Sequence, residues 1–80
     1  MCKVKARVVD GFIDSEKFAY VEEASGETCE VLVGATKVSR DSLEVTEVAR
    51  EKDRVLVELP RESSRGFWRI WVRPAQLIAG

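Results

Sequence analysis

Two runs of alternating apolar and polar residues near the C-terminus constrain the fold of this 80-residue chain more than any other feature. The runs cover residues 55–60 and 67–73, and the residues between them include Ser63, Ser64 and Gly66. Alternation with a period of two is typical of β-strands that bury one face, and turn-forming residues between two such runs indicate a β-hairpin. We therefore predict a hairpin over residues 55–73.

The register of this hairpin follows if Leu59 lies opposite Trp68. The inner layer then consists of six large apolar residues, Val55, Val57, Leu59, Trp68, Ile70 and Val72. On the outer side the same register sets Glu58 opposite Arg69. It also sets Leu56 opposite Trp71. Arginine and aromatic side chains therefore share a face that meets either water or a partner.

The rest of the chain divides into short strands separated by turns. We predict strands over residues 2–9, 18–23 and 28–33, a bend at Gly11, a loop at 34–38, and turns at 14–17, 24–27 and 39–42. Alternation places Cys2, Val4, Ala6 and Val8 on one face of the first strand, and Cys29, Val31 and Val33 on the inner face of the third. The tail at 74–78 is expected to pack Leu77 or Ile78 over an open end of the fold.

Residues 43–52 fit two kinds of secondary structure. Residues 41–44 have the spacing of a capping box, and Val45, Val48 and Ala49 fall on one side of a helix. The β-branched side chains here, and the alternation of Leu43 with Val45, favour a strand instead. We predict the strand, with at most one short helical turn near residues 39–44.

The composition is that of one folded domain spanning residues 1–80. The chain is 45% hydrophobic and 34% charged, with a formal net charge of −1. No apolar run approaches the roughly 20 residues of a membrane-spanning helix, and the N-terminus lacks the apolar core of a signal peptide. We therefore expect a cytoplasmic protein that does not enter the membrane. The slightly acidic balance argues against non-specific binding to nucleic acid.

Neither a catalytic motif nor a metal-binding motif is present. The chain contains no histidine, the side chain that most often transfers protons at neutral pH. Cys2 and Cys29 are too far apart in sequence for a zinc or redox motif, so we expect two reduced cysteines that point inward. The sequence therefore predicts a protein without catalytic activity, cofactor or metal.

The outer face of the closing hairpin is the candidate binding surface. It is formed by Leu56, Arg65, Phe67, Arg69, Trp71 and Arg73. Because tryptophan and arginine are enriched at protein interfaces, we first expect a homo-oligomer, a dimer or a tetramer, or a protein partner. A second interpretation is purely structural, with Arg69 paired to Glu58 across the strands. The third is binding of single-stranded nucleic acid or a small anionic ligand, which the acidic balance disfavours.

The strand meander, the aromatic closing strand with Phe67, Trp68 and Trp71, and the short tail at 74–77 together resemble the Src-homology-3-like small barrels. This resemblance implies an all-β fold, a small antiparallel barrel of five or six strands. Residues 70–77 are also similar to the end of the plasmid-type (type II) dihydrofolate reductases, tetramers with an active pore. That family's pore carries Gln-Ile-Tyr where this chain has Arg69-Ile70-Trp71, so an enzyme with a site between subunits is only an alternative.

Overall fold

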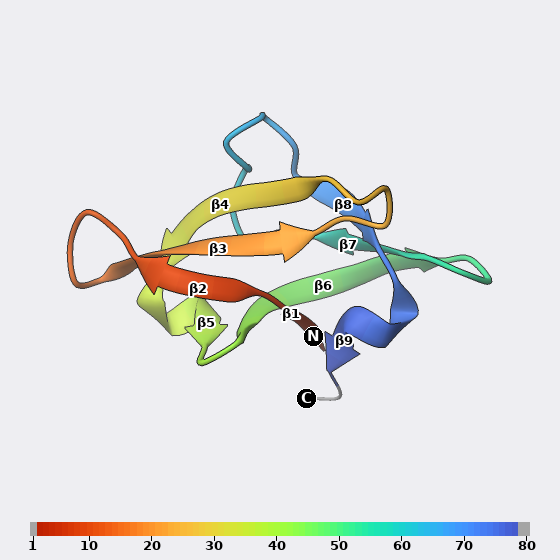
Figure 1. The fold of residues 1–80 in the computed structure, drawn as a ribbon, viewed down its shortest axis with the longest axis horizontal. Coiled ribbons are helices and arrows are strands. Elements are labelled where there is room, and N and C mark those ends of the chain that lie inside the picture. Colours follow the sequence, from red (N-terminus) through yellow and green to blue (C-terminus); the bar gives the residue numbers. More distant parts are fainter. Residues whose placement is uncertain (1, 79–80) are drawn as a thin grey trace.

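The computed structural model describes residues 2–78, which fold into short strands joined by loops and two 3₁₀ turns (Figure 1). The strands are β1 Cys2–Lys5, β2 Arg7–Asp10, β3 Glu16–Glu22, β4 Thr28–Gly34, β5 Val38–Ser39, β6 Ser42–Arg50, β7 Val55–Glu58, β8 Arg69–Val72 and β9 Leu77–Ile78. The 3₁₀ turns are η1 Ala35–Lys37 and η2 Pro74–Gln76. The predicted all-β class is confirmed.

The strands form two antiparallel sheets. One has the order β8-β7-β6-β1-β9, with β5 paired to β6, and the other has the order β2-β3-β4. The sheets do not close into the predicted barrel, although the small all-strand domain is compatible with a Src-homology-3-like fold. The predicted strand at 2–9 is interrupted at Ala6, where the backbone N–H donates to the carbonyl of Asp41 at 2.9 Å. The chain therefore passes at this residue from one sheet to the other.

The hydrophobic core lies between the inner faces of the two sheets. It consists of Val4, Ala19, Val21, Cys29, Val31, Val33, Leu43, Val45, Val55, Val57, Leu59, Ile70 and Val72. These residues alternate with exposed or half-buried ones along their strands, as expected when one face of a strand is buried. The inward orientation predicted for Cys29, Val31 and Val33 is confirmed.

The register predicted for the closing hairpin is confirmed over β7 and β8. Val55 lies opposite Val72, Leu56 opposite Trp71, Val57 opposite Ile70, and Glu58 opposite Arg69. The inward orientation predicted for Trp68 is wrong, because this side chain is 53% exposed. Leu59 N–H still donates to the Trp68 carbonyl at 2.7 Å, but β8 begins only at Arg69. Trp68 therefore lies where the chain leaves the sheet and no facing strand covers its ring.

The ambiguous segment at 43–52 is a strand, since β6 runs through it to Arg50 with an irregularity between Glu47 and Ala49. The helical turn predicted near 39–44 lies earlier, at η1. The bend and turn predicted at Gly11 and 14–17 are instead one loop, which runs from Gly11 to the start of β3. A side chain at Gly11 would meet the Glu16 carbonyl oxygen at 2.8 Å, so this close approach requires glycine.

The C-terminal segment adds a short edge strand to the larger sheet. This strand, β9, pairs with β1, so that Ile78 lies opposite Lys3 and Leu77 opposite Val4. Leu77 packs against the core, as predicted for one of the two tail residues, while Ile78 is 36% exposed.

Both cysteines are free thiols, Cys29 buried and Cys2 half-buried. Neither 3₁₀ turn within residues 2–78 has the length or apolar character needed to cross a membrane.

Leu43 offers a direct test of this core, because it is fully buried and lies in β6, the strand that pairs with β1, β5 and β7. We expect Leu43→Ala to lower the free energy of unfolding by about 2–5 kcal/mol, through lost burial and the cavity left behind. Urea denaturation followed by circular dichroism measures this change. Val48→Ala, at an exposed position of the same strand, should shift it by less than about 0.5 kcal/mol. Equal losses in the two variants would contradict this core.

Candidate functional site

The structure places the predicted binding residues in three positions around β8. Leu56, Arg69 and Trp71 lie on the outer face of β7 and β8, where Leu56 and Trp71 are cross-strand partners. Arg65 and Phe67 belong to the loop before β8, and Arg73 follows the strand. Trp71 is half-buried, and the guanidinium carbon of Arg54 lies 3.9 Å from the centre of its ring. Arg54 therefore already occupies one face of this indole.

Each predicted arginine has a carboxylate partner within the chain. Arg69 Nε lies 3.0 Å from Glu58 Oε1, the cross-strand pair of the structural interpretation. Arg65 Nη1 lies 2.7 Å from Glu27 Oε2. Arg73 pairs with Glu22 of β3. The positive charge of this surface is thus balanced locally.

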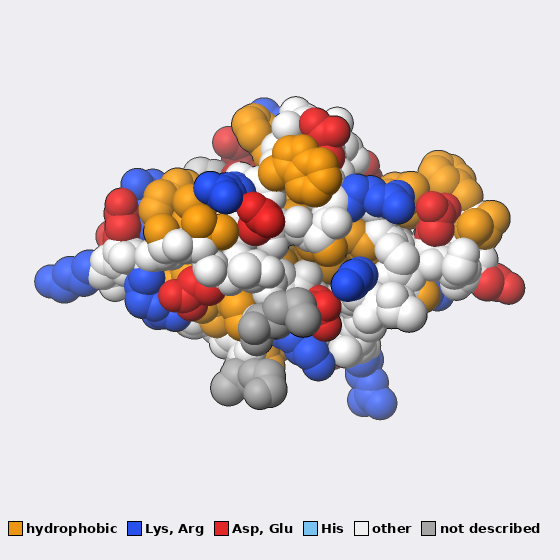
Figure 2. All heavy atoms as spheres, turned by 180° about the vertical axis from the view of Figure 1, so that it is seen from behind, with side chains coloured by type: hydrophobic (Ala, Val, Ile, Leu, Met, Phe, Trp, Pro, Cys, Tyr) orange, Lys and Arg blue, Asp and Glu red, His pale blue; other side chains and the backbone are white. Residues whose placement is uncertain are grey.

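On the face of the molecule opposite to the one seen in Figure 1, charged side chains interrupt the hydrophobic ones. Figure 2 shows hydrophobic side chains there in several separate islands, with basic and acidic side chains between them. The Phe67 side chain is 51% exposed, and the guanidinium carbon of Arg65 lies 5.9 Å from the centre of its ring. Both predicted aromatic residues, Trp71 and Phe67, therefore lie beside an arginine of the chain itself.

A more continuous aromatic surface lies on the outer face of the smaller sheet, and sequence reasoning missed it. The register sets Val9, Phe18 and Leu32 side by side across its three strands. Phe12, which is 80% exposed, packs edge-on against Phe18 with 5.4 Å between ring centres. Phe18 in turn stacks with Tyr20 at 6.5 Å. We call Val9, Phe12, Phe18, Tyr20 and Leu32 the aromatic ridge.

The signal that could have revealed the ridge is the alternation within β3. Phe18 and Tyr20 occupy the positions between the buried residues Ala19 and Val21, so both rings must face outward. Their neighbours on the ridge come from other strands and from a loop. Those contacts depend on the strand register, which the sequence reading did not specify for this sheet.

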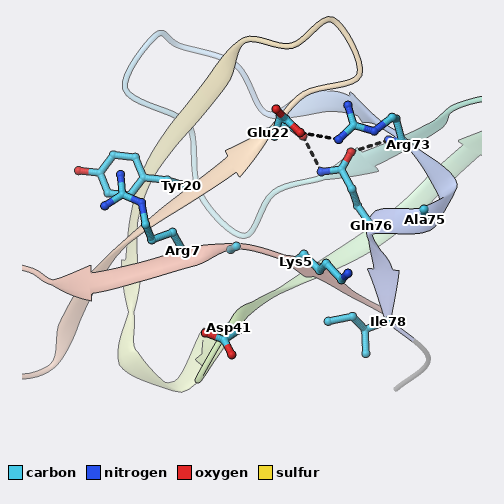
Figure 3. A pocket seen from close by; sticks show the side chains of 10 residues that line it. Lys5, Arg7, Tyr20, Glu22, Asp41, Arg73, Ala75, Gln76 and Ile78 are labelled. Atoms are coloured by element: carbon cyan, nitrogen blue, oxygen red, sulfur yellow. Dashed lines mark hydrogen bonds and ion pairs between the residues drawn. The ribbon is translucent and has the colours of Figure 1, made fainter.

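The ridge ends at a hollow of about 820 Å³ beside the break at Ala6 (Figure 3). Arg7 and Tyr20 form one side of the hollow, with the guanidinium carbon of Arg7 4.6 Å from the ring centre of Tyr20. Lys5 lies in the middle, and Ala75 and Ile78 of the C-terminal segment lie on the far side.

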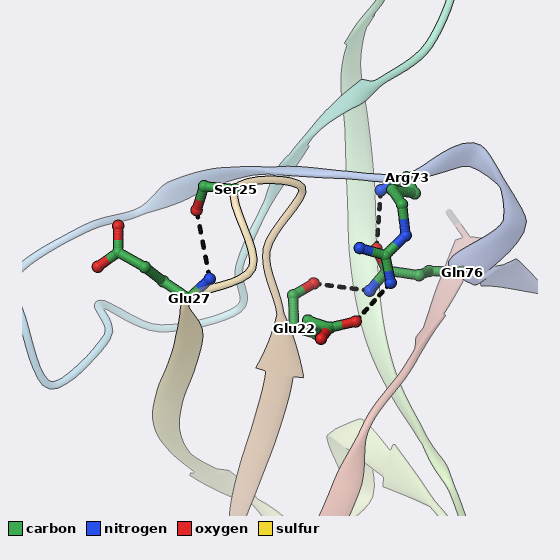
Figure 4. Close-up of polar contacts among 5 residues, drawn as sticks. All are labelled: Glu22, Ser25, Glu27, Arg73 and Gln76. Atoms are coloured by element: carbon green, nitrogen blue, oxygen red, sulfur yellow. Dashed lines mark hydrogen bonds and ion pairs between the residues drawn. The ribbon is translucent and has the colours of Figure 1, made fainter.

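A buried amide fixes the far wall of this hollow (Figure 4). Gln76 Nε2 donates to the Glu22 carbonyl at 2.6 Å, and Gln76 Oε1 accepts from the Arg73 backbone N–H at 2.8 Å. Gln76 is only 7% exposed, so these two bonds satisfy both ends of its amide in a place with little access for water. They join the C-terminal segment to the end of β3.

The loop between β7 and β8 is attached to the smaller sheet at Glu30. Ser64 N–H donates to the Glu30 carbonyl at 2.8 Å, and Ser64 Oγ donates to Glu30 Oε1 at 2.6 Å. The bonds from Ser64 and from the Tyr20 phenol lower the pKa of the Glu30 carboxyl group. The same bond to Glu30 raises the pKa of Tyr20. The loop that carries Arg65 and Phe67 is therefore held against β4.

The fold and these surfaces define a small antiparallel two-sheet domain with an aromatic ridge and an adjoining hollow. No model of a known protein family, no curated protein and no solved structure matches this chain. Residues 2–78 contain no group of three or more Asp, Glu, Cys or His side chains that could hold a metal ion.

Removal of the Gln76 amide tests the attachment of the C-terminal segment. We expect Gln76→Ala to lower the free energy of unfolding by about 1–3 kcal/mol, because Arg73 N–H and Glu22 C=O both lose their partner. Urea denaturation measures this loss. Thr36→Ala, at an exposed position in the other 3₁₀ turn, serves as the control and should have little effect. A loss no larger than that of the control would contradict the role of the amide.

The attachment at Glu30 predicts a dependence on pH. Because folding lowers the pKa of this group below 4.5, its stabilising effect is present above that value and is lost as the pH falls through the lower pKa of the folded state. The protection factor of the Ser64 amide, which compares its exchange rate with that of an unfolded chain at the same pH, should therefore fall in acid. Glu30→Gln should weaken this dependence of the protection factor on pH.

Asp10→Asn is the matched control, because the pKa of Asp10 is also lowered, in this case by Lys17. It should reduce the dependence of overall stability on pH without changing exchange at Ser64. Amide-resolved NMR distinguishes the two variants. Identical behaviour of Ser64 in both would show that Glu30 does not hold the loop.

Proposed function

We propose that this protein is a non-catalytic assembly module that forms a homodimer through its aromatic ridge. The observation that supports this most directly is the continuous contact from Phe12 through Phe18 to Tyr20 on an outer sheet face. We also propose that it acts in the cytoplasm, where the free thiols of Cys2 and Cys29 stay reduced.

Contiguous aromatic surface favours association with a protein. Phe12 and its neighbour Ile13 are 80% and 59% exposed, and they extend the ridge at one end of the molecule. Aromatic rings bury a large area when covered and have few internal rotations to lose, so they contribute strongly to interfaces. Burial of Phe12 alone would stabilise a complex by about 1.5–3 kcal/mol.

The charge pattern around the ridge favours a second copy of this chain as the partner. Lys17 Nζ pairs with Asp10 Oδ1 at 2.7 Å near one end, and Glu30 accepts hydrogen bonds near the other. Arg7 covers the end of the row by lying over Tyr20. Because Lys17 is neutralised by Asp10 and the charges of Arg7 and Glu30 have opposite signs, two copies can meet face to face with little net repulsion, and the chain's net charge of −1 adds little more. Sheets commonly pack in this way, about 10 Å apart.

The size of the ridge implies a weak dimer. The seven residues of β3 span about 24 Å, and three strands span about 14 Å, so the flat area of the sheet is about 340 Å². Stable interfaces bury about 800 Å² on each partner. The exposed loop side chains add area, but the total stays at the low end of specific interfaces. The dimer should therefore dissociate on dilution.

The hairpin face predicted from sequence remains the competing assembly surface. Leu56 and Trp71 still offer apolar area there, although Arg54 covers one face of the indole. Binding of single-stranded nucleic acid at this face would require phosphates to displace the carboxylate partners of Arg65, Arg69 and Arg73. The ridge needs no such displacement, which is why we place the interface there.

The chain offers a matched pair of substitutions that separates the two surfaces. Phe12 and Phe67 are both exposed phenylalanines in loops, one on the ridge and one beside the hairpin face. We expect sedimentation velocity of the unmodified protein to show a concentration-dependent species of twice 9.0 kDa. Phe12→Asp should weaken dimerisation at least about tenfold, because it buries a charge in the interface, whereas Phe67→Asp should not.

The opposite result, with dimerisation lost only in Phe67→Asp, would move the interface to the hairpin face. A monomer at every concentration would overturn the dimer proposal altogether. Circular dichroism of both variants checks that they remain folded, as expected for substitutions at exposed positions.

A further inference from the structure

The hollow beside Ala6 is a consequence of the change of sheet at this residue. β1 stays in the larger sheet and β2 joins the smaller one, so Lys5 and Arg7 flank the break. The C-terminal segment forms the opposite wall and is held there by the two bonds of Gln76. The volume of about 820 Å³ falls within the range of small-molecule sites.

The basic side chains of this hollow differ in whether they are already paired. Arg73 is engaged by Glu22. Neither Lys5 nor Arg7 forms an ion pair with any residue in the range 2–78. Both side chains lie at the hollow, and Arg7 is oriented by its stacking on Tyr20 (Figure 3). The planar donor edge of Arg7 is therefore available to an acceptor.

The remaining lining is suited to an apolar group. Ala6, Ala75 and Ile78 present methyl and methylene groups around the same space as Lys5. Tyr20 also lines the hollow, and its ring lies 4.6 Å from the guanidinium carbon of Arg7. A ligand here would meet the Arg7 guanidinium at one end, Lys5 in the middle and the aliphatic side chains of Ala75 and Ile78 at the other end (Figure 3).

We propose that this hollow binds a small amphipathic carboxylate, an apolar ring or chain that bears one carboxylate group. Arg7 holds the carboxylate through the paired N–H groups of its guanidinium, which match the two carboxylate oxygens. Lys5 supplies a second positive charge. Ala75 and Ile78 contact the apolar part of the ligand.

The balance of charge in the lining selects one negative charge over two. Lys5, Arg7 and Arg73 are opposed by Glu22 and Asp41, so the three cations exceed the two carboxylates by one. A monoanion neutralises this excess. A phosphate dianion would leave a net negative charge beside Asp41, and it has no apolar part to meet Ile78. The hollow shares Tyr20 with the aromatic ridge, but Lys5, Ala75 and Ile78 lie outside the ridge, and binding of the carboxylate does not require that the dimer forms.

The test uses the full chain and measures affinity by isothermal titration calorimetry with naphthoate and with octanoate. Naphthamide, a neutral isostere of naphthoate, and inorganic phosphate are the ligand controls. We expect naphthoate or octanoate to bind at least about tenfold more tightly than either control, because a paired, charge-assisted contact contributes at least that factor. The two carboxylates distinguish a ring from a chain as the natural ligand.

Matched variants locate the site. Arg7→Gln and Lys5→Gln should each weaken binding at least about fivefold, whereas Lys52→Gln, which also removes one exposed positive charge but lies in the turn between β6 and β7, should not. Ala75→Phe, at an exposed position of η2, should fill the hollow and exclude the ligand. Amide-resolved NMR should show shifts at residues 5–7, 20 and 75–78.

Any one of four results would overturn the proposal. The first two are equal affinity for naphthoate and naphthamide, and equal loss of affinity in Arg7→Gln and Lys52→Gln. The others are NMR shifts centred on Trp71 instead of the hollow, and absence of binding by both carboxylates at millimolar concentration. Because Phe12→Asp leaves the hollow unchanged, it should retain ligand affinity, which separates this test from that of the dimer.

Discussion

The core of this protein is filled entirely by aliphatic side chains and one cysteine, and most of its other properties follow from that restriction. None of the six aromatic residues of the chain belongs to it. Valine is the commonest core residue here, and its short branched side chain suits the narrow space between two small sheets. Rings that cannot enter this space must lie on the surface, where Phe12, Phe18 and Tyr20 gather on one sheet face.

The same thin core explains why polar bonds stabilise the ends of the fold. A domain of about 80 residues buries a smaller share of its surface than a larger domain does, so segments beyond the core depend on other contacts. Gln76 provides such contacts for the C-terminal segment, and Ser64 provides them for the loop before β8. Both residues are tied to the smaller sheet, so these polar bonds hold the two sheets together where the core ends.

The sequence predicted the parts of the fold that depend on alternation within one or two neighbouring strands. The all-β class, the register of β7 with β8 and the strand at 43–52 are of this kind. It did not predict the break at Ala6, because that break is caused by a bond to Asp41, 35 residues away in the chain. The exposure of Trp68 was missed for a similar reason, since alternation assigns a face but does not reveal where the facing strand ends.

The candidate site was predictable only in composition. A surface of aromatic and arginine side chains was expected, but the sequence placed it on the hairpin, where the structure pairs Arg65, Arg69 and Arg73 with glutamates from three different strands or turns. Two backbone hydrogen bonds limit how another chain could add to the edges of the sheets. Ser64 occupies the Glu30 carbonyl on edge strand β4, and Ala24 N–H occupies the Trp71 carbonyl on edge strand β8. An incoming strand would have to break them, so addition of further strands at these two edges, and with it growth into open-ended fibrils there, is opposed.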